Sequence, residues 1–133
     1  LFNKFNLQLI VLACFGLLSP IFYSCTKYID TEYKVLNKYS DTIKIHVCGI
    51  IYSYFNGEEE KCYTYYINPE STCPVRGLDA KEDATIEDIF TEFVISKNSI
   101  TSTKNPYDIS LWNKETQTDK VVYTLVVDST FFE

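Results

Sequence analysis

The sequence is poor in the residues from which catalytic and metal sites are commonly built. It has one histidine, His46, and none of its five cysteines forms a Cys-x-x-Cys pair, so neither a zinc site nor a His-based catalytic site is expected. It also lacks a basic excess: 12 Lys and Arg residues stand against 18 Asp and Glu residues, which argues against a nucleic-acid partner. With 133 residues and no Pro-, Gly- or Ser-rich linker, the chain is expected to form one domain without a cofactor or metal.

The long apolar sequence is confined to the N-terminus. Lys4 precedes an apolar run over residues 7–18, which is interrupted only by Gln8, broken at Ser19-Pro20 and followed by Ser24-Cys25. A short basic region, a hydrophobic region and a small residue before a cut are typical of a secretory signal peptide. The uninterrupted run is too short to span ~30 Å of hydrocarbon as a helix, so a transmembrane anchor is the weaker interpretation.

Cys25 is the expected N-terminus of the chain after cleavage. The segment Ile-Phe-Tyr-Ser-Cys at residues 21–25 is similar to a bacterial lipobox, in which the Cys is acylated and becomes the mature N-terminus. We therefore expect a lipoprotein signal peptide over residues 1–24, lipidation at Cys25 and a lipidated tether over residues 25–32. Ordinary cleavage, which would leave Cys25 a plain thiol, is the alternative. Two or more acyl chains hold a small domain stably on a membrane, which predicts an outer-membrane lipoprotein of the cell envelope, facing the periplasm or the outside.

Residues 33–133 are expected to form a β-domain. Alternation over residues 42–47 places Ile43, Ile45 and Val47 on one strand face, and Asn56-Gly57 predicts a two-residue turn into a strand over residues 61–67. The other expected elements are strands over residues 33–36, 107–112 and 121–127, a hairpin over 95–103, polar turns over 37–41 and 113–119, and a long loop over 69–83.

One segment has a helical pattern. Ile86, Ile89, Phe90 and Phe93 follow an i, i+3, i+4, i+7 spacing, which predicts a short helix near residues 86–92. Together with about seven short strands rich in β-branched and aromatic residues, it predicts a mainly β fold, an immunoglobulin-like β-sandwich that follows a cleaved signal peptide.

Three segments of the predicted domain carry a family resemblance: NKYSDTI at residues 37–43, IEDIF at 86–90 and VYTL at 122–125. They resemble segments of small lipoproteins of Bacteroides and relatives, in which such motifs start and end strands after the lipid-bearing Cys. Ile86 stands where that family often has Trp. The resemblance implies an envelope location and a β-sandwich fold, and it implies no chemistry.

Three cysteines fall in the predicted domain: Cys48, Cys62 and Cys73. An envelope compartment permits disulfides, and an odd number allows at most one bridge within the domain. A two-residue turn would place Cys62 opposite Ile51 and leave Cys48 on the other face, so Cys62–Cys73 is the expected disulfide. Three buried thiols that pack as small apolar groups are the alternative.

The polar residues predict no enzyme. His46 and Cys48 share a strand face and could approach as base and nucleophile, but no orienting or oxyanion-binding group accompanies them. Acidic side chains are dense over residues 58–60 and 79–92, yet they lack the spacing of a calcium loop. A charged hairpin tip and a helix dipole account for them.

Tyrosines provide the most distinctive candidate for a ligand face. Tyr52, Tyr54, Tyr63 and Tyr65 lie on the two arms of the predicted hairpin, each pair at even spacing. An exposed tyrosine stripe would stack sugars or contact a protein, whereas a half-buried stripe would fill the sandwich face with cross-strand pairs.

Thr42 is a candidate modification site, because Asp41-Thr42-Ile43 matches a loose pattern for O-glycosylation in envelope proteins. The sequence as a whole predicts a lipid-anchored, non-catalytic structural or interaction module of unknown ligand. A glycan-binding surface module that uses the tyrosine-rich hairpin is the alternative. The expected partners are the membrane and a protein or glycan.

Overall fold

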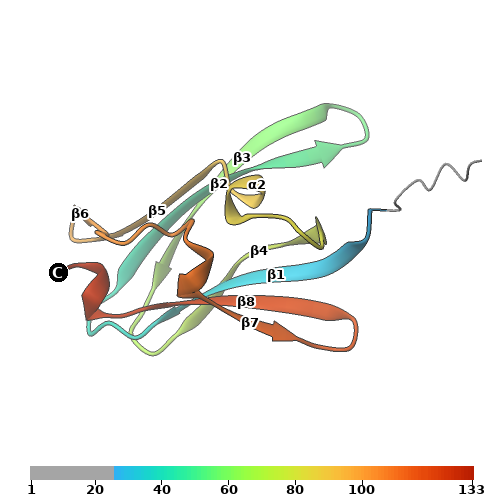
Figure 1. The fold of residues 1–133 in the computed structure, drawn as a ribbon. Coiled ribbons are helices and arrows are strands. Elements are labelled where there is room, and N and C mark those ends of the chain that lie inside the picture. Colours follow the sequence, from blue (N-terminus) through green and yellow to red (C-terminus); the bar gives the residue numbers. More distant parts are fainter. Residues whose placement is uncertain (1–25) are drawn as a thin grey trace, which may run out of the picture.

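The protein is a sandwich of two four-stranded β-sheets in a computed structural model that describes residues 26–133 (Figure 1). The expected signal peptide and the expected lipidation of Cys25 lie outside the described residues. The described helices are too short and not apolar enough to cross a membrane. The prediction of a mainly β sandwich with one short helix is confirmed, with eight strands in place of about seven.

The first sheet has the strand order β4-β1-β8-β7, and the second has the order β3-β2-β5-β6. The strands of the first sheet are β1 (Tyr28–Asn37), β4 (Thr72–Lys81), β7 (Trp112–Thr116) and β8 (Lys120–Val127). Those of the second are β2 (Ile43–Ser53), β3 (Gly57–Ile67), β5 (Glu92–Lys97) and β6 (Ile100–Thr101). All pairings are antiparallel except that of β1 with β8, which is parallel.

The core between the sheets is built mainly from alternate residues of β1, β2 and β5, with further buried residues from β8. The expected face of β2 is buried, with Ile43 and Ile45 at 0% exposure. Opposite them, Tyr33 of β1 is 2% exposed and has its ring centroid 5.4 Å from that of Phe90 and 5.8 Å from that of Trp112, both in edge-to-face contact. Such aromatic contacts add to the stabilisation that burial of the rings supplies.

The short helix α2 (Ile86–Ile89) begins as the sequence predicts. Thr85 and Asp88 form a capping box, in which each side chain bonds to the backbone of the other residue. The helix ends sooner than expected because Phe90 is already extended and the chain then enters β5.

Strand β4 corrects the expectation of a long loop over residues 69–83. Pro74 and Gly77 weaken its strand signal, but β4 is an edge strand, where a missing N–H group is tolerated. A register shift opposite Tyr33 and Lys34 leaves one residue of β4 unpaired, in the manner of a bulge. Strand β1 likewise begins at Tyr28, so residues 28–32 belong to the sheet and not to the expected tether.

Asn37, a fully buried polar residue, ties the loops together at the end of the sandwich near the C-terminus. Its side-chain Nδ2 donates to the carbonyl oxygens of Asp41 and Ile67, each at 2.8 Å, and its Oδ1 accepts from the backbone N–H of Tyr39 at 2.9 Å. Every polar atom of the side chain is thereby paired, which is the condition for burying it at low cost. This network gives residues 37–43 a structural role.

Candidate functional site

The two sheets separate at the end of the sandwich from which the β2–β3 hairpin projects (Figure 1). A cleft of about 920 Å³ lies here between the hairpin on one side and β4 with α2 on the other. We call it the inter-sheet cleft. Its walls carry aromatic rings, basic side chains and carboxylates together, a mixture that suits a partly polar ligand.

Arg76 reaches across the inter-sheet cleft from β4 to β2. Its Nη2 donates a hydrogen bond to the carbonyl oxygen of Ile50, and its guanidinium carbon lies 6.0 Å from the ring centroid of Phe90. Desolvation of the half-buried guanidinium lowers the pKa of Arg76. Among residues 26–133 no carboxylate forms an ion pair with it. A half-buried cation without an acidic partner retains donors for an incoming acceptor.

Gly49 makes the crossing of Arg76 possible. A Cβ atom at this position would overlap Nη1 of Arg76 and would lie 2.9 Å from the backbone oxygen of Ile89. The absence of a side chain on β2 therefore gives the guanidinium its place in the cleft.

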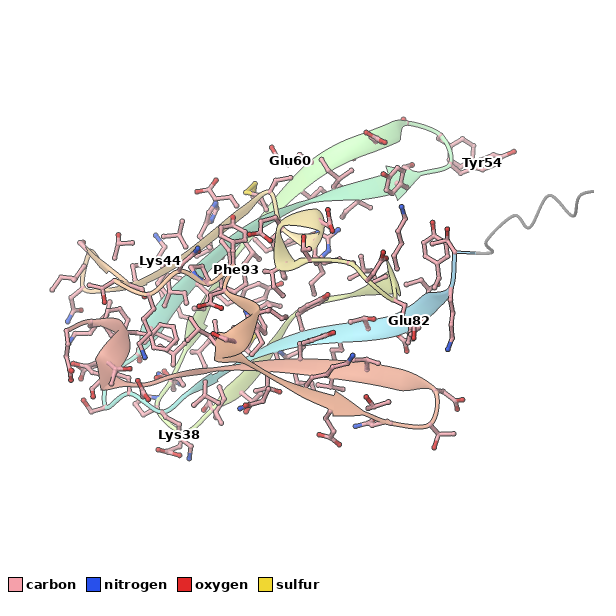
Figure 2. The ribbon with its side chains drawn as sticks, in the orientation of Figure 1. Lys38, Lys44, Tyr54, Glu60, Glu82 and Phe93 are labelled. Carbon is pink, nitrogen blue, oxygen red and sulfur yellow. A yellow bond between two sulfur atoms is a disulfide. The ribbon has the colours of Figure 1, made fainter. Side chains whose placement is uncertain are left out.

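The four tyrosines of the predicted ligand face do not form one face. Tyr63 lines the inter-sheet cleft at 49% exposure, and Tyr52 lies at its rim at 77% exposure. Tyr65 packs against the core, with its ring centroid 6.5 Å from that of Tyr63. Tyr54 is in the turn and projects away from the body of the sandwich, whereas Phe93 lies between the sheets (Figure 2). Only half of the expected face therefore borders the cleft.

The disulfide joins Cys48 to Cys62, and Cys73 is a free thiol, so the expected Cys62–Cys73 pairing is wrong. The turn consists of residues 54–56, because Ser53 pairs with Gly57, whose φ of 70° is in the left-handed region. Because this turn lies earlier in the chain than the expected turn at residues 56–57, Cys48 is directly opposite Cys62. The error arose from assigning a two-residue loop to Asn56-Gly57.

The disulfide is part of a second group of polar side chains on the outer face of the β3-β2-β5 sheet. His46 Nε2 lies 3.5 Å from Cys48 Sγ, and His46 Nδ1 lies 2.9 Å from Thr64 Oγ1. Glu92 Oε2 lies 3.7 Å from Cys48 Sγ on the other side. We call His46, Cys48, Cys62, Thr64 and Glu92 the outer-face cluster. His46 and Cys48 do approach, as the sequence suggested, but in the disulfide Cys48 has no thiol to act as a nucleophile.

The remaining candidates are dispersed. Thr42 is exposed in the loop before β2, and its Oγ1 donates to Asn68 Oδ1 at 3.0 Å. Asp88 serves the helix cap, and its hydrogen bonds with Thr85 lower the pKa of its carboxyl group.

Within residues 26–133, one group of three or more potential ligands converges closely enough for a single metal ion, namely His46, Cys48 and Cys62.

Comparison with known proteins gives no relative: the chain matches no protein-family model, no curated protein and no solved structure. The geometry of the two sites therefore carries the functional argument.

Proposed function

We propose that the chain is a lipid-anchored protein of the cell envelope that acts as a non-catalytic interaction module and binds its ligand in the inter-sheet cleft. The observation that carries the proposal is Arg76, a half-buried cation without an acidic partner among the described residues, held in an open cleft beside aromatic rings. Burying a charge without a partner is costly, and a ligand that accepts hydrogen bonds offsets that cost.

The walls of the cleft suggest how a ligand is held. Arg76 has five N–H donors, and the carbonyl oxygen of Ile50 takes one of them. Tyr63 and Phe90 line the same cleft, and the guanidinium carbon of Arg76 lies 6.0 Å from the ring centroid of Phe90. A ligand with a carboxylate or several hydroxyl groups can accept hydrogen bonds from Arg76, and an apolar surface next to these groups can pack on the aromatic rings.

Site-specific photocrosslinking in cells tests this binding. A photoreactive residue in place of Tyr63 is expected to yield a discrete adduct, which Arg76→Gln in the same chain weakens. The matched control places the same residue at Tyr66, which is equally a tyrosine of β3 but lies outside the cleft. Equal adducts from both positions, or none from Tyr63 together with no bound glycan, would contradict a ligand site in the cleft.

A glycan is the second candidate for the ligand. It is favoured by Tyr52 and Tyr63, because exposed tyrosine rings next to hydroxyl-binding side chains are suited to stacking sugars. On a glycan array we expect binding that Tyr63→Ala and Arg76→Gln reduce and Tyr66→Ala preserves. A chain that binds no glycan on the array leaves a protein as the ligand.

The lipid anchor rests on the sequence of residues 21–25. Cells fed labelled palmitate are expected to label the chain, and Cys25→Ser is expected to remove the label. Cys73→Ser is the matched control, since Cys73 is a free thiol on β4 and should not affect labelling. Label that persists in the Cys25→Ser variant would refute the anchor.

A further inference from the structure

We propose that the Cys48–Cys62 disulfide holds a latent zinc site closed, and that after its reduction the two thiolates and His46 bind Zn²⁺, with Glu92, which lies beside Cys48, turning in as the fourth ligand. The site is the outer-face cluster. It lies on the opposite side of the second sheet from the core, and the inference does not depend on the anchor or on the inter-sheet cleft.

The register of three strands brings the ligands together. Cys48 of β2 pairs with Cys62 of β3 on one side and with Glu92 of β5 on the other, so the three residues form one row across the sheet. His46 lies two residues before Cys48 on the same strand and therefore on the same face. Three of these ligands, His46, Cys48 and Cys62, already converge, and all four come from strands rather than from loops, as an accurate site requires.

Two distances to Cys48 Sγ already match a tetrahedral zinc centre. Zinc bonds of about 2.3 Å to sulfur and about 2.0–2.2 Å to nitrogen or oxygen place an N or O ligand about 3.6 Å from a sulfur ligand. His46 Nε2 is 3.5 Å and Glu92 Oε2 is 3.7 Å from Cys48 Sγ. The two sulfurs must separate to about 3.8 Å, which breaking the bond between them allows. Glu92 must also turn toward the ion, because the atoms that already converge are those of His46, Cys48 and Cys62.

Thr64 orients the histidine for this role. It pairs with His46 across the ladder, and its Oγ1 lies 2.9 Å from Nδ1. An Nδ1–H that donates to this oxygen leaves the lone pair on Nε2, which faces the sulfur. Metal-binding histidines almost always donate their second ring N–H in this way.

The electron and proton balance is simple. A dithiol reductant supplies two electrons through thiol–disulfide exchange, the sulfur–sulfur bond breaks, and the reductant leaves as its own disulfide. The two new thiols each release a proton to solvent as Zn²⁺ binds between them. Thiolate and imidazole ligands select zinc over the hard cations Ca²⁺ and Mg²⁺. Oxidation by a disulfide reverses the sequence and expels the ion.

Metal titration of the full chain, extracted in detergent, tests the proposal. The chain is reduced with a phosphine under anaerobic conditions and titrated with Co²⁺, a spectroscopic probe for tetrahedral thiolate sites, and then with Zn²⁺. We expect one ion per chain in the reduced form, none in the oxidised form, and displacement of Co²⁺ by Zn²⁺. Thr64→Val should weaken the affinity by about 10- to 100-fold, and His46→Ala by more, since it removes a ligand.

One substitution controls for a thiol outside the site. Cys73→Ser should leave the Co²⁺ spectrum and the stoichiometry unchanged, because Cys73 is a free thiol on β4. Near-ultraviolet circular dichroism of the buried Trp112 follows folding of the reduced chain in every titration. No metal binding, equal binding by the His46→Ala variant, dependence on Cys73, or loss of the folded signal on reduction would each overturn the proposal.

Discussion

Two groups of aromatic side chains lie in the same sandwich under opposite conditions. One is the enclosed group around Tyr33, which is 2% exposed and stacks on Tyr123 with ring centroids 5.3 Å apart. The other is the group at the tip of the β2–β3 hairpin, where Tyr54 is 97% and Phe55 is 90% exposed. Rings of the same chemistry thus stabilise the fold in one place and face solvent in the other.

This difference in exposure distinguishes the rings that stabilise the fold from the rings that are free to contact a ligand. The enclosed rings fill the space between both sheets, whereas the hairpin extends beyond its partner strands and leaves its rings uncovered (Figure 1). An exposed aromatic group on a short protruding element contributes little to folding and is a common mark of an interaction site. Gly49 and Arg76 lie at the boundary between the two regions, where the cleft begins.

The largest expected effect comes from truncating a ring in the enclosed group. Tyr33→Ala should lower the free energy of unfolding by about 3–5 kcal/mol, because it leaves a cavity between the sheets. Tyr54→Ala, the same substitution at the exposed tip, should change it by no more than about 0.5 kcal/mol. Urea denaturation of both variants provides the measurement. Similar losses in the two variants would remove the distinction between the regions.

Alkaline pH should lower the stability of the fold through ionisation of Tyr33 in the enclosed group. Burial, with a smaller effect from Tyr123, raises the pKa of Tyr33 from 10.0 to about 12. The folded state therefore resists ionisation, and its stability is complete below pH 10 and falls as the pH rises through about 12. About 2–3 kcal/mol of unfolding free energy should be lost over this range.

Denaturant unfolding at a series of pH values, with phenolate absorbance recorded in parallel, measures this loss. Tyr33→Phe keeps the ring and removes the ionisable group, so it should flatten the alkaline decline. A decline of unchanged depth in that variant would show that another group is responsible.

The smallest of the three effects is expected at Gly49, at the boundary between the two aromatic groups. Gly49→Ala should cost about 1–2 kcal/mol, since the new Cβ displaces the Arg76 guanidinium and crowds the Ile89 carbonyl oxygen. Gly77→Ala is the matched control, because a Cβ there meets no atom within 4 Å, and it should leave stability unchanged or slightly higher. Thermal unfolding compares the two variants, and equal melting temperatures would mean that the guanidinium moves aside freely.

Local pattern was enough to predict much of the fold. The alternation of β2 identified its buried face, and Thr85 with Asp88 identified the start of α2. Strand β4 escaped prediction because Pro74 and Gly77 are unfavourable in strands in general and are tolerated only at an edge. Whether a strand lies at an edge is a property of the assembled sheet, which local sequence does not encode.

The candidate sites show the same limit. Tyr52 and Tyr63 were identified by type, but Arg76 was missed because it lies on the unpredicted strand, although it is the only Arg in the chain. The disulfide was misassigned because it depends on a turn of residues 54–56, and a small error in the turn alters every pair in the ladder. Arg76 is a single Arg followed directly by Gly77, and this rarity is a signal in the sequence that could have identified it as a candidate site residue.

The parallel pairing of β1 with β8 has a consequence for the order of folding. Asp30 pairs with Lys120 and Asn37 with Val127, so the central ladder of the first sheet joins the start of the described chain to its end. That ladder cannot form until residue 127 is available, and contacts between such distant residues form slowly. A nascent chain of this protein therefore cannot complete its first sheet until residues 120–127 have been synthesised. This delay suits the export that we propose, because a chain that threads across a membrane must stay extended until it has crossed.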